Sequence, residues 1–103
     1  MKVYKFGGAS VRNADGVRNL HKIIGDEEHL FIIVSAMGKT TNALERVFRG
    51  LQLGDREASA KEIAELRRYH DEIVADLWRK PTTLPAVEGL FTELEQIAAK
   101  SDY

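Results

Sequence analysis

Four residues near the start of the chain have the chemistry to bind phosphate, and they are Lys5, Gly7, Gly8 and Ser10. Glycines let phosphate oxygens approach the backbone closely. The hydroxyl of Ser10 can donate a hydrogen bond, and the ammonium group of Lys5 is a compact positive charge. Phosphoryl transfer depends on positioning the phosphate and neutralising its charge. These residue types at this spacing therefore suit that reaction.

A second glycine-containing segment follows an apolar run and reads Ser-Ala-Met-Gly-Lys-Thr-Thr over residues 35–41. Its Gly38-Lys39-Thr40 part looks like the end of the phosphate loop GxxxxGK[ST]. The first glycine of that pattern would stand at position 33, but Ile33 lies there, inside the apolar run. We therefore reject the P-loop interpretation. A strand end followed by a helix start still offers free N–H groups and a helix dipole to an anion.

The elements that must position these segments form a strand, a helix and a strand. Residues 2–6 predict a short strand rich in β-branched and aromatic residues. A helix is expected from about Asn13 to Ile24, with Gly25 as its stop. The unbroken apolar run within residues 29–35 predicts a parallel strand covered on both faces. In such a right-handed unit both glycine segments follow strand ends, so they open on the same edge of the sheet, where ligands bind.

Only helices are expected from residue 42 onward. A capping-box pattern at Asn42 and Glu45 predicts the start of the first. Ser59 is expected to cap a second helix, which Pro81 ends. Pro85 suits the first turn of the last helix.

The predicted sheet is incomplete, because two parallel strands alone do not form a stable sheet. One interpretation is that the chain is the first part of a larger α/β domain and stops before the third strand. The other is a small α+β domain that completes its sheet by dimerising. The periodicity of the sequence leaves both open.

Composition excludes several classes of protein. The chain has 103 residues, which suits one small domain, and its net charge of -1 gives no field for nucleic acid or an anionic membrane. It has no cysteine, which excludes disulfides and fits a reducing compartment. We read neither a secretion signal nor a membrane span of roughly 20 apolar residues, and expect a cytoplasmic protein.

The aromatic and histidine side chains have no ligand-like arrangement. His21, His29 and His70 lack partners at metal-ligand spacing, so we read them as structural or solvated and expect no metal site. Trp78 and Phe91 are expected in the hydrophobic core.

The two glycine segments together resemble the N-terminal signature of the aspartokinases, within the amino acid kinase family. Residues 5–11 read Lys-Phe-Gly-Gly-Ala-Ser-Val, and residues 34–42 read Val-Ser-Ala-Met-Gly-Lys-Thr-Thr-Asn. By motif the resemblance covers the chain up to Asn42, and beyond that only its helical character agrees. It implies an α/β/α sandwich around a mainly parallel sheet. It also implies transfer of the γ-phosphoryl group of ATP, with Mg²⁺, to the side-chain carboxylate of L-aspartate. The product, 4-phospho-L-aspartate, leads to lysine, threonine and methionine.

The resemblance also implies roles for individual residues. It implies that four residues bind the phosphates of ATP, namely Lys5, Gly7, Gly8 and Ser10. Lys5 is in addition the implied catalytic residue, which stabilises charge on the phosphoryl group in transfer. Ser35 would line the phosphoryl site, and Thr41 would contact aspartate. Met37, Lys39 and Thr40 receive no role, and no residue is assigned to a metal.

The family's later motifs lie outside these 103 residues. A Gly-Glu motif, a later Arg and Asp, an adenine-binding segment and regulatory ACT domains are absent, and Asp102-Tyr103 falls where the next strand should approach. We therefore expect residues 1–103 to be the N-terminal fragment of an amino acid kinase domain, inactive alone, from a parent that forms a homo-oligomer. The alternatives are a stand-alone, non-catalytic anion-binding or interaction module, or a kinase acting on glutamate, acetylglutamate or carbamate.

Overall fold

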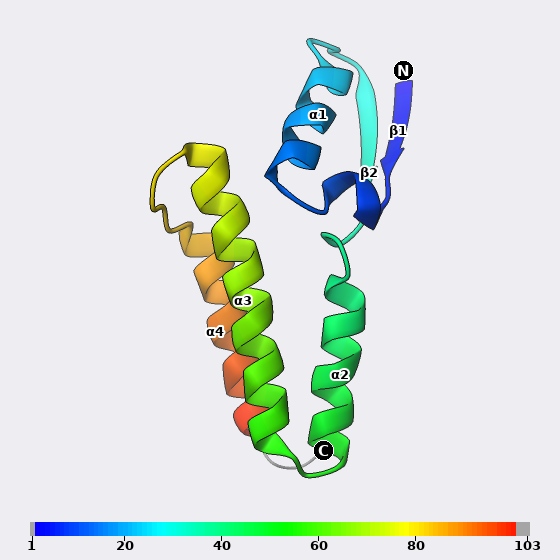
Figure 1. Cartoon of the computed structure of the whole chain (residues 1–103). Helices are drawn as coiled ribbons and strands as arrows, with labels where there is room; N and C mark the ends of the chain where they lie inside the picture. The colour runs from blue at the N-terminus through cyan, green and yellow to red at the C-terminus, as the bar shows by residue number, and fades with distance from the viewer. Residues whose placement is uncertain (1, 101–103) are drawn as a thin grey trace. The chain divides into compact units, whose positions relative to one another are not determined.

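The structure is a computed structural model that describes residues 2–100 (Figure 1). The chain is a mixed α/β protein and divides after Thr40 into two compact units. The first unit contains the two strands, and the second contains three helices. Within the described part of the chain, none of the helices has the length and apolar character needed to cross a membrane.

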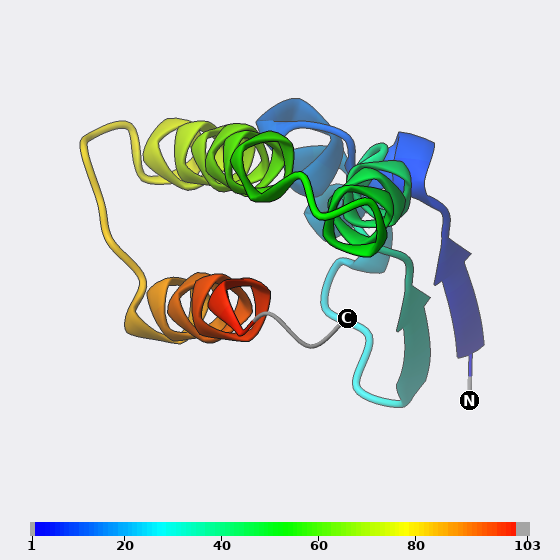
Figure 2. The ribbon, with the colours of Figure 1, turned by 90° about the horizontal axis from the view of Figure 1, so that it is seen from below.

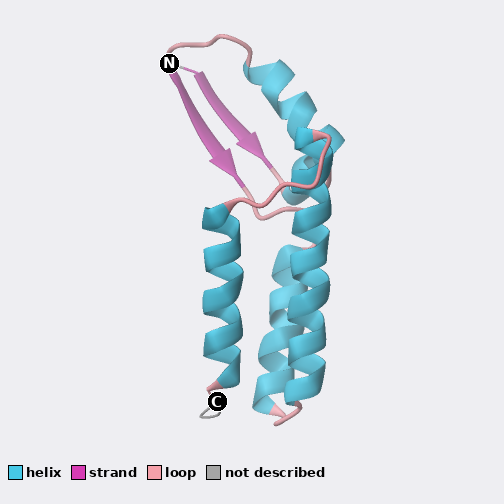
Figure 3. Ribbon diagram, turned by 90° about the vertical axis from the view of Figure 1, so that its left-hand side faces the viewer, coloured by secondary structure: helices cyan, strands magenta, loops and turns pink. Residues whose placement is uncertain are grey.

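The first unit is the expected strand, helix and strand. Strands β1 (Lys2–Phe6) and β2 (Leu30–Val34) pair in parallel, with Lys2 opposite Leu30 and Phe6 opposite Val34. Helix α1 (Ala14–Ile24) connects them. Figure 3 shows the two strands side by side and pointing the same way. A short 3-10 helix, η1 (Gly8–Val11), follows β1 and was not predicted.

Both ends of α1 form as the sequence predicts. The Asn13 side chain accepts a hydrogen bond from the Gly16 N–H at 2.9 Å, which satisfies one of the free donors of the first turn. At the other end Gly25 has φ of +58° and donates its N–H to the His21 carbonyl at 3.0 Å. A glycine adopts that backbone conformation without strain. The helix is therefore fixed at both ends by local chemistry.

The prediction that β2 is covered on both faces is wrong for the described structure. All of its residues except the half-buried Leu30 are exposed. The physical reason is that the described sheet has only these two strands, so each strand has a free edge and one connecting helix cannot cover both faces. The apolar run predicted the strand correctly and its surroundings incorrectly.

The second unit consists of α2 (Thr40–Gln52), α3 (Arg56–Trp78) and α4 (Pro85–Ala99). Helix α4 lies alongside α3 (Figure 1, Figure 2). All three helices contribute to one hydrophobic core. Its buried members are Ala43, Val47, Ile63, Leu66 and Phe91. The apolar faces of the three helices thus pack against one another within this unit.

Two predicted helix starts are wrong. Helix α2 begins at Thr40 rather than at Asn42. Helix α3 begins at Arg56, because the carboxylate of Asp55 caps it and accepts the Ala58 N–H at 3.0 Å. Ser59 is not a cap but a buried residue, whose hydroxyl donates to the Val47 carbonyl at 2.9 Å. The expected start of α4 at Pro85 is confirmed.

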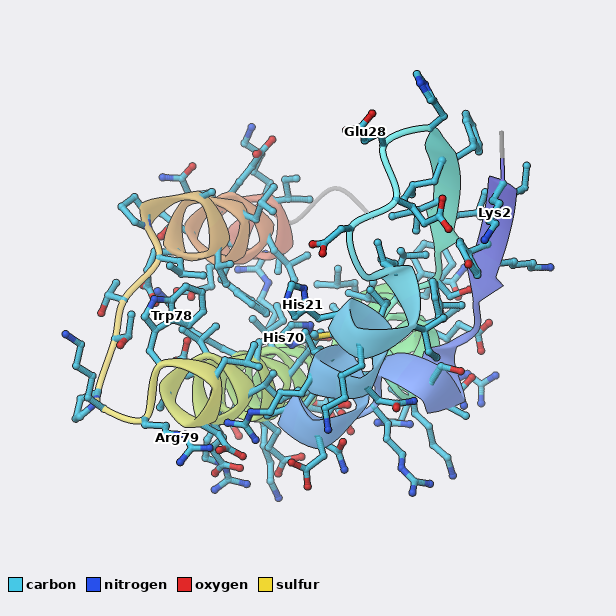
Figure 4. All side chains as sticks on the ribbon, turned by 90° about the horizontal axis from the view of Figure 1, so that it is seen from above. Lys2, His21, Glu28, His70, Trp78 and Arg79 are labelled. Atoms are coloured by element: carbon cyan, nitrogen blue, oxygen red, sulfur yellow. The ribbon has the colours of Figure 1, made fainter. Side chains whose placement is uncertain are left out.

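The histidine and aromatic side chains of the second unit correct one further expectation, and Figure 4 labels His70 and Trp78 among them. Phe91 is buried as predicted, and the His70 ring packs against it with centroids 5.4 Å apart. A ring nitrogen of His70, Nδ1, lies 2.9 Å from the Leu66 carbonyl oxygen, so this histidine is structural. Trp78 is 49 % exposed and does not belong to the core, because α3 ends there.

One arginine of α3 forms ion pairs with two glutamates of α4. The guanidinium of Arg67 in α3 pairs with Glu88 and Glu95, which lie on α4, and it lies 5.9 Å from the centre of the Phe91 ring. The hydrogen bond with Glu88 raises the pKa of Arg67, so the group stays charged throughout the physiological range. This charge therefore joins two helices.

Gly50 allows α2 and α3 to approach closely. A Cβ atom at Gly50 would lie 2.3 Å from the buried Ser59 hydroxyl and 3.2 Å from the Asp55 carbonyl oxygen. We expect Gly50→Ala to lower the free energy of unfolding by about 1–3 kcal/mol, since overpacking displaces neighbouring groups. Urea denaturation followed by circular dichroism measures the change.

Gly89 provides the matched control, because it lies inside α4 and a Cβ atom at this position would meet nothing within 4 Å. Gly89→Ala should raise the free energy of unfolding by about 0.5–1 kcal/mol through helix propensity alone. Equal stability of the two variants would show that the helices do not meet at Gly50.

Candidate phosphate-binding site

Two loops meet at the carboxyl end of the sheet in the first unit. The Ser35 N–H donates to the Phe6 carbonyl at 2.9 Å, so the strand pairing continues one residue beyond β2. The Gly38 N–H then donates to the Gly8 carbonyl at 3.0 Å. Segments that are far apart in the sequence are thereby held together by backbone hydrogen bonds. The structure brings the two glycine segments to one edge, as their positions after parallel strands suggest.

Glycine is needed at positions 8 and 38 for two different reasons, which are the close backbone approach at Gly8 and the backbone conformation of Gly38. A Cβ atom at Gly8 would lie 2.7 Å from the Gly38 carbonyl oxygen and 3.1 Å from that of Ala36. Those neighbours are backbone atoms, so they cannot rotate away as a side chain would. Gly38 has φ of +53°, a left-handed conformation that side chains disfavour. Both glycines therefore serve the junction of the loops.

Gly7 is different, because nothing inside the described structure requires a glycine there. Its φ of -78° and ψ of 172° are extended backbone that any residue adopts. A Cβ atom at this position would meet nothing within 4 Å. The residue is exposed, and its backbone is open to an approaching ligand. A glycine that the chain itself does not need is what a close-fitting phosphate would require.

Lys5 lies in β1 opposite Ile33, one residue before the end of the strand pairing. It is exposed, and it has no carboxylate partner among residues 2–100. Its positive charge is therefore available to an anion that lies near the carboxyl end of the sheet. Lys39, in the second loop, is exposed as well, although the family resemblance implies no role for it.

The hydroxyl-bearing residues divide into two groups. Ser10 lies in η1, where its N–H donates to the Gly7 carbonyl at 3.0 Å, and Ser35 follows β2 directly. Both side chains are exposed and belong to the first unit. Thr41 is exposed in the first turn of α2 and belongs to the second unit. The first unit thus groups five of the six predicted site residues, without Thr41.

Two residues of the second loop have structural roles that were not predicted. Gly38 forms the backbone bond to Gly8, and the Thr40 hydroxyl donates to the Met37 carbonyl at 2.5 Å, which closes the turn into α2. The signal for Gly38 was present, since a lone glycine between a strand and a helix favours a left-handed turn. The signal for Thr40 was its hydroxyl near a helix start.

The loops suit an anion rather than a protein-bound metal ion. They offer lysine side chains, hydroxyls and backbone N–H groups. Across residues 2–100, no group of three His, Cys, Asp or Glu side chains is placed to hold a metal ion. This charge pattern fits phosphate and leaves any divalent cation to be held by the phosphates themselves.

Comparison with known proteins places the sequence in a family. The sequence model of the amino acid kinase family matches residues 1–98. An aspartokinase of Chlamydia trachomatis serovar D is 35 % identical over 100 residues, a match that covers 88 % of this chain and 22 % of that protein. The chain therefore spans about a fifth of the length of the curated relative that it matches.

The two adjacent glycines should respond differently to the same substitution. Gly8→Ala is expected to speed hydrogen exchange of the Gly38 amide by about tenfold or more, since displacing the loops costs about 1–3 kcal/mol. Gly7→Ala should leave that exchange rate within about threefold of the original, as expected for a surface change of under 0.5 kcal/mol. Amide exchange followed by NMR measures both. Similar protection of the Gly38 amide in both variants would contradict the junction described above.

Proposed function

From the premise that this chain belongs to the amino acid kinase family, we propose that it forms the N-terminal part of an aspartokinase. The reaction is transfer of the γ-phosphoryl group of ATP to the side-chain carboxylate of L-aspartate. Support comes from the aspartokinase-like sequence of both glycine segments and from the similarity to the chlamydial aspartokinase. The parent protein is expected to form a homo-oligomer, and that stays a prediction.

The observation that carries the proposal is the hydrogen bond from the Gly38 N–H to the Gly8 carbonyl at 3.0 Å. It holds the two loops together, while Gly7 stays open and Lys5 stays without a carboxylate partner among the described residues. An anionic phosphate can then approach the Gly7 backbone without meeting a side chain. The Ser10 and Ser35 hydroxyls can donate to its oxygens.

In the proposed reaction an oxygen of the aspartate carboxylate attacks the γ-phosphorus as the bond to the β-phosphate oxygen breaks. ADP leaves with the electron pair of the broken bond, and 4-phospho-L-aspartate is formed. Lys5 neutralises charge on the phosphoryl oxygens as they move. Thr41 is assigned to aspartate, and its position in the other unit makes that assignment depend on how the units meet in the parent enzyme.

Mg²⁺ accompanies ATP in this proposal and supplies charge neutralisation at the phosphates when it is bound. Among the described residues, no group of three or more His, Cys, Asp or Glu side chains is placed to hold it. We therefore assign no residue of this chain to binding the cation. The chain's own contribution to neutralising the phosphate charge comes from Lys5 and the backbone N–H groups.

A second candidate is a stand-alone module that binds an anion without catalysis. The observation in its favour is that the two loops proposed to bind phosphate both lie in the first unit, within residues 1–40. The two candidates share the site and differ in whether further residues bring aspartate and adenine to it.

Both candidates require Lys5 at the phosphate, and its charge can be removed without shortening the side chain much. Lys5→Met should weaken binding of ATP by about tenfold or more, since a hydrogen bond to a charged group contributes about 1.5–3 kcal/mol. Isothermal titration calorimetry with ATP and Mg²⁺ measures the affinity. Lys61→Met, which removes an exposed lysine of α3, is the control and should bind as the original does. Equal binding by both variants would remove Lys5 from the site.

The enzyme proposal also predicts that the 103-residue chain alone does not phosphorylate aspartate. The reason is that it supplies a phosphate site and matches only 22 % of the chlamydial enzyme. A hydroxylamine-trapping assay with ATP, Mg²⁺ and L-aspartate detects the acyl phosphate. Steady turnover by the purified chain, absent from Lys5→Met, would overturn the assignment of this chain as an incomplete catalytic part.

A further inference from the structure

The second loop contains a lysine that the proposed function does not use. Lys39 directly follows Gly38, whose N–H donates to the Gly8 carbonyl at 3.0 Å. On its other side the Thr40 N–H donates to the Met37 carbonyl at 3.1 Å, and the Thr40 hydroxyl donates to the same oxygen at 2.5 Å. Hydrogen bonds on both sides therefore hold the backbone of Lys39 beside the junction of the two loops, within the first unit.

The acidic residues of the chain are absent from the segments that build this edge. Neither residues 1–14 nor residues 29–44 contain an aspartate or a glutamate, although the chain has 16 of them. These two segments include both strands and both loops. At the amino end of the sheet Lys2 is neutralised, because it pairs with Glu27 at 2.6 Å. The carboxyl end has no such acidic neighbour in its own segments and keeps its positive charge.

Two lysines lie at the carboxyl end, one from each strand-and-loop segment. Lys5 and Lys39 have no carboxylate partner among residues 2–100. The carboxylate nearest to the first loop in sequence is that of Asp15, and it pairs with Arg18 at 2.9 Å. Like charges at one edge repel each other, and an anion between them removes that repulsion. The two lysines therefore suit a single polyanion held between the loops.

The reactants of the proposed reaction are both anions. The aspartate carboxylate must approach the γ-phosphoryl group of ATP against their mutual repulsion. Lys39 follows the glycine that bonds to the first loop, and it precedes by two residues Thr41, which is assigned to aspartate. In chain order it thus lies between the phosphate loops and the acceptor. A cation in that position lowers the repulsion as the two groups approach.

We propose that Lys39 is a further catalytic residue, which binds the γ-phosphoryl group of ATP from the second loop while Lys5 acts from the first. The carboxylate oxygen attacks the γ-phosphorus, the bond to the β-phosphate oxygen breaks, and ADP leaves with the electron pair of that bond. Both lysines stay protonated and neutralise the oxygens of the group in transfer. This inference rests on the proposed function, since it takes the polyanion and the acceptor from that reaction.

The affinities of the 103-residue chain for ATP and ADP test the assignment, because only ATP has the γ-phosphoryl group. Lys39→Met should weaken binding of ATP with Mg²⁺ by about tenfold, as expected for the loss of one charge-assisted hydrogen bond. It should change the affinity for ADP by less than about threefold, as a surface substitution does. Lys39→Arg keeps the charge and should recover most of the lost ATP affinity. Isothermal titration calorimetry measures all of these affinities.

Lys22→Met is the matched control. Lys22 is exposed in the last turn of α1, so this variant removes a lysine from the same unit but from the end of the helix that leads into β2. It should bind ATP as the original chain does. Hydrogen exchange of the Gly38 amide in Lys39→Met should stay within about threefold of the original, which shows that the loop junction is intact.

The outcomes separate this inference from the proposed function. Weaker ATP binding in Lys5→Met but not in Lys39→Met would overturn the inference and leave the proposed phosphate site in place. Equal losses of ATP and ADP affinity in Lys39→Met would overturn the assignment to the γ-phosphoryl group. Unchanged ATP affinity in both lysine variants, or no ATP binding by the original chain at millimolar concentration, would overturn the phosphate site as well.

The aspartokinase reaction itself is tested separately, with the full-length parent in the hydroxylamine-trapping assay. A parent that binds ATP through Lys39 and forms no acyl phosphate with L-aspartate would overturn the aspartokinase proposal and keep Lys39 at the γ-phosphoryl group. A parent that forms the acyl phosphate at the same rate with methionine at position 39 would overturn the catalytic role of Lys39 and keep the aspartokinase proposal.

Discussion

The hydrogen bond from the Gly38 N–H to the Gly8 carbonyl, 3.0 Å long, is the constraint on which the candidate site depends. It joins the two loops where the parallel strands end, and it forms only because Gly8 has no Cβ atom to meet the backbone of Gly38 and Ala36. The register of β1 and β2 brings the loops to the same level, and this bond fixes their separation. The placement of Lys5, Ser10 and Ser35 at one edge follows from that junction.

The glycines of the first unit show that one residue type serves different physical ends. Gly8 permits a close backbone approach, and Gly16 permits another, since its Cβ atom would lie 2.4 Å from the Ser10 carbonyl oxygen. Gly25 and Gly38 adopt positive φ. Gly7 has neither reason, and this makes it the most informative of the five about a ligand. A motif that counts glycines treats them alike, whereas the structure separates those that serve folding from the one that faces outward.

Local signals in the sequence predicted local structure well. Asn13 and Gly25 defined α1, the apolar run defined β2, and Pro85 defined α4, because each acts through its own backbone or its nearest neighbours. Non-local effects were not predictable. Ser59 looks like a cap, but it is buried against Val47 because Gly50 lets two helices approach. The convergence of the two loops could be inferred from topology, while the need for Gly38 depended on a contact with a residue distant in the sequence.

Lys5 links the two incomplete features of the first unit. It lies in β1 opposite Ile33, on the same face of the sheet as Val3 and Phe31, and it is also the cation nearest in sequence to the open Gly7. Any layer that covers Val3 and Phe31 also restricts the side chain of Lys5, since alternation places all of them on one side of the sheet. Covering the face lowers the local dielectric and so strengthens the attraction between this ammonium and a phosphate. A cover over this face of the sheet and a stronger charge interaction at Lys5 would therefore arise together.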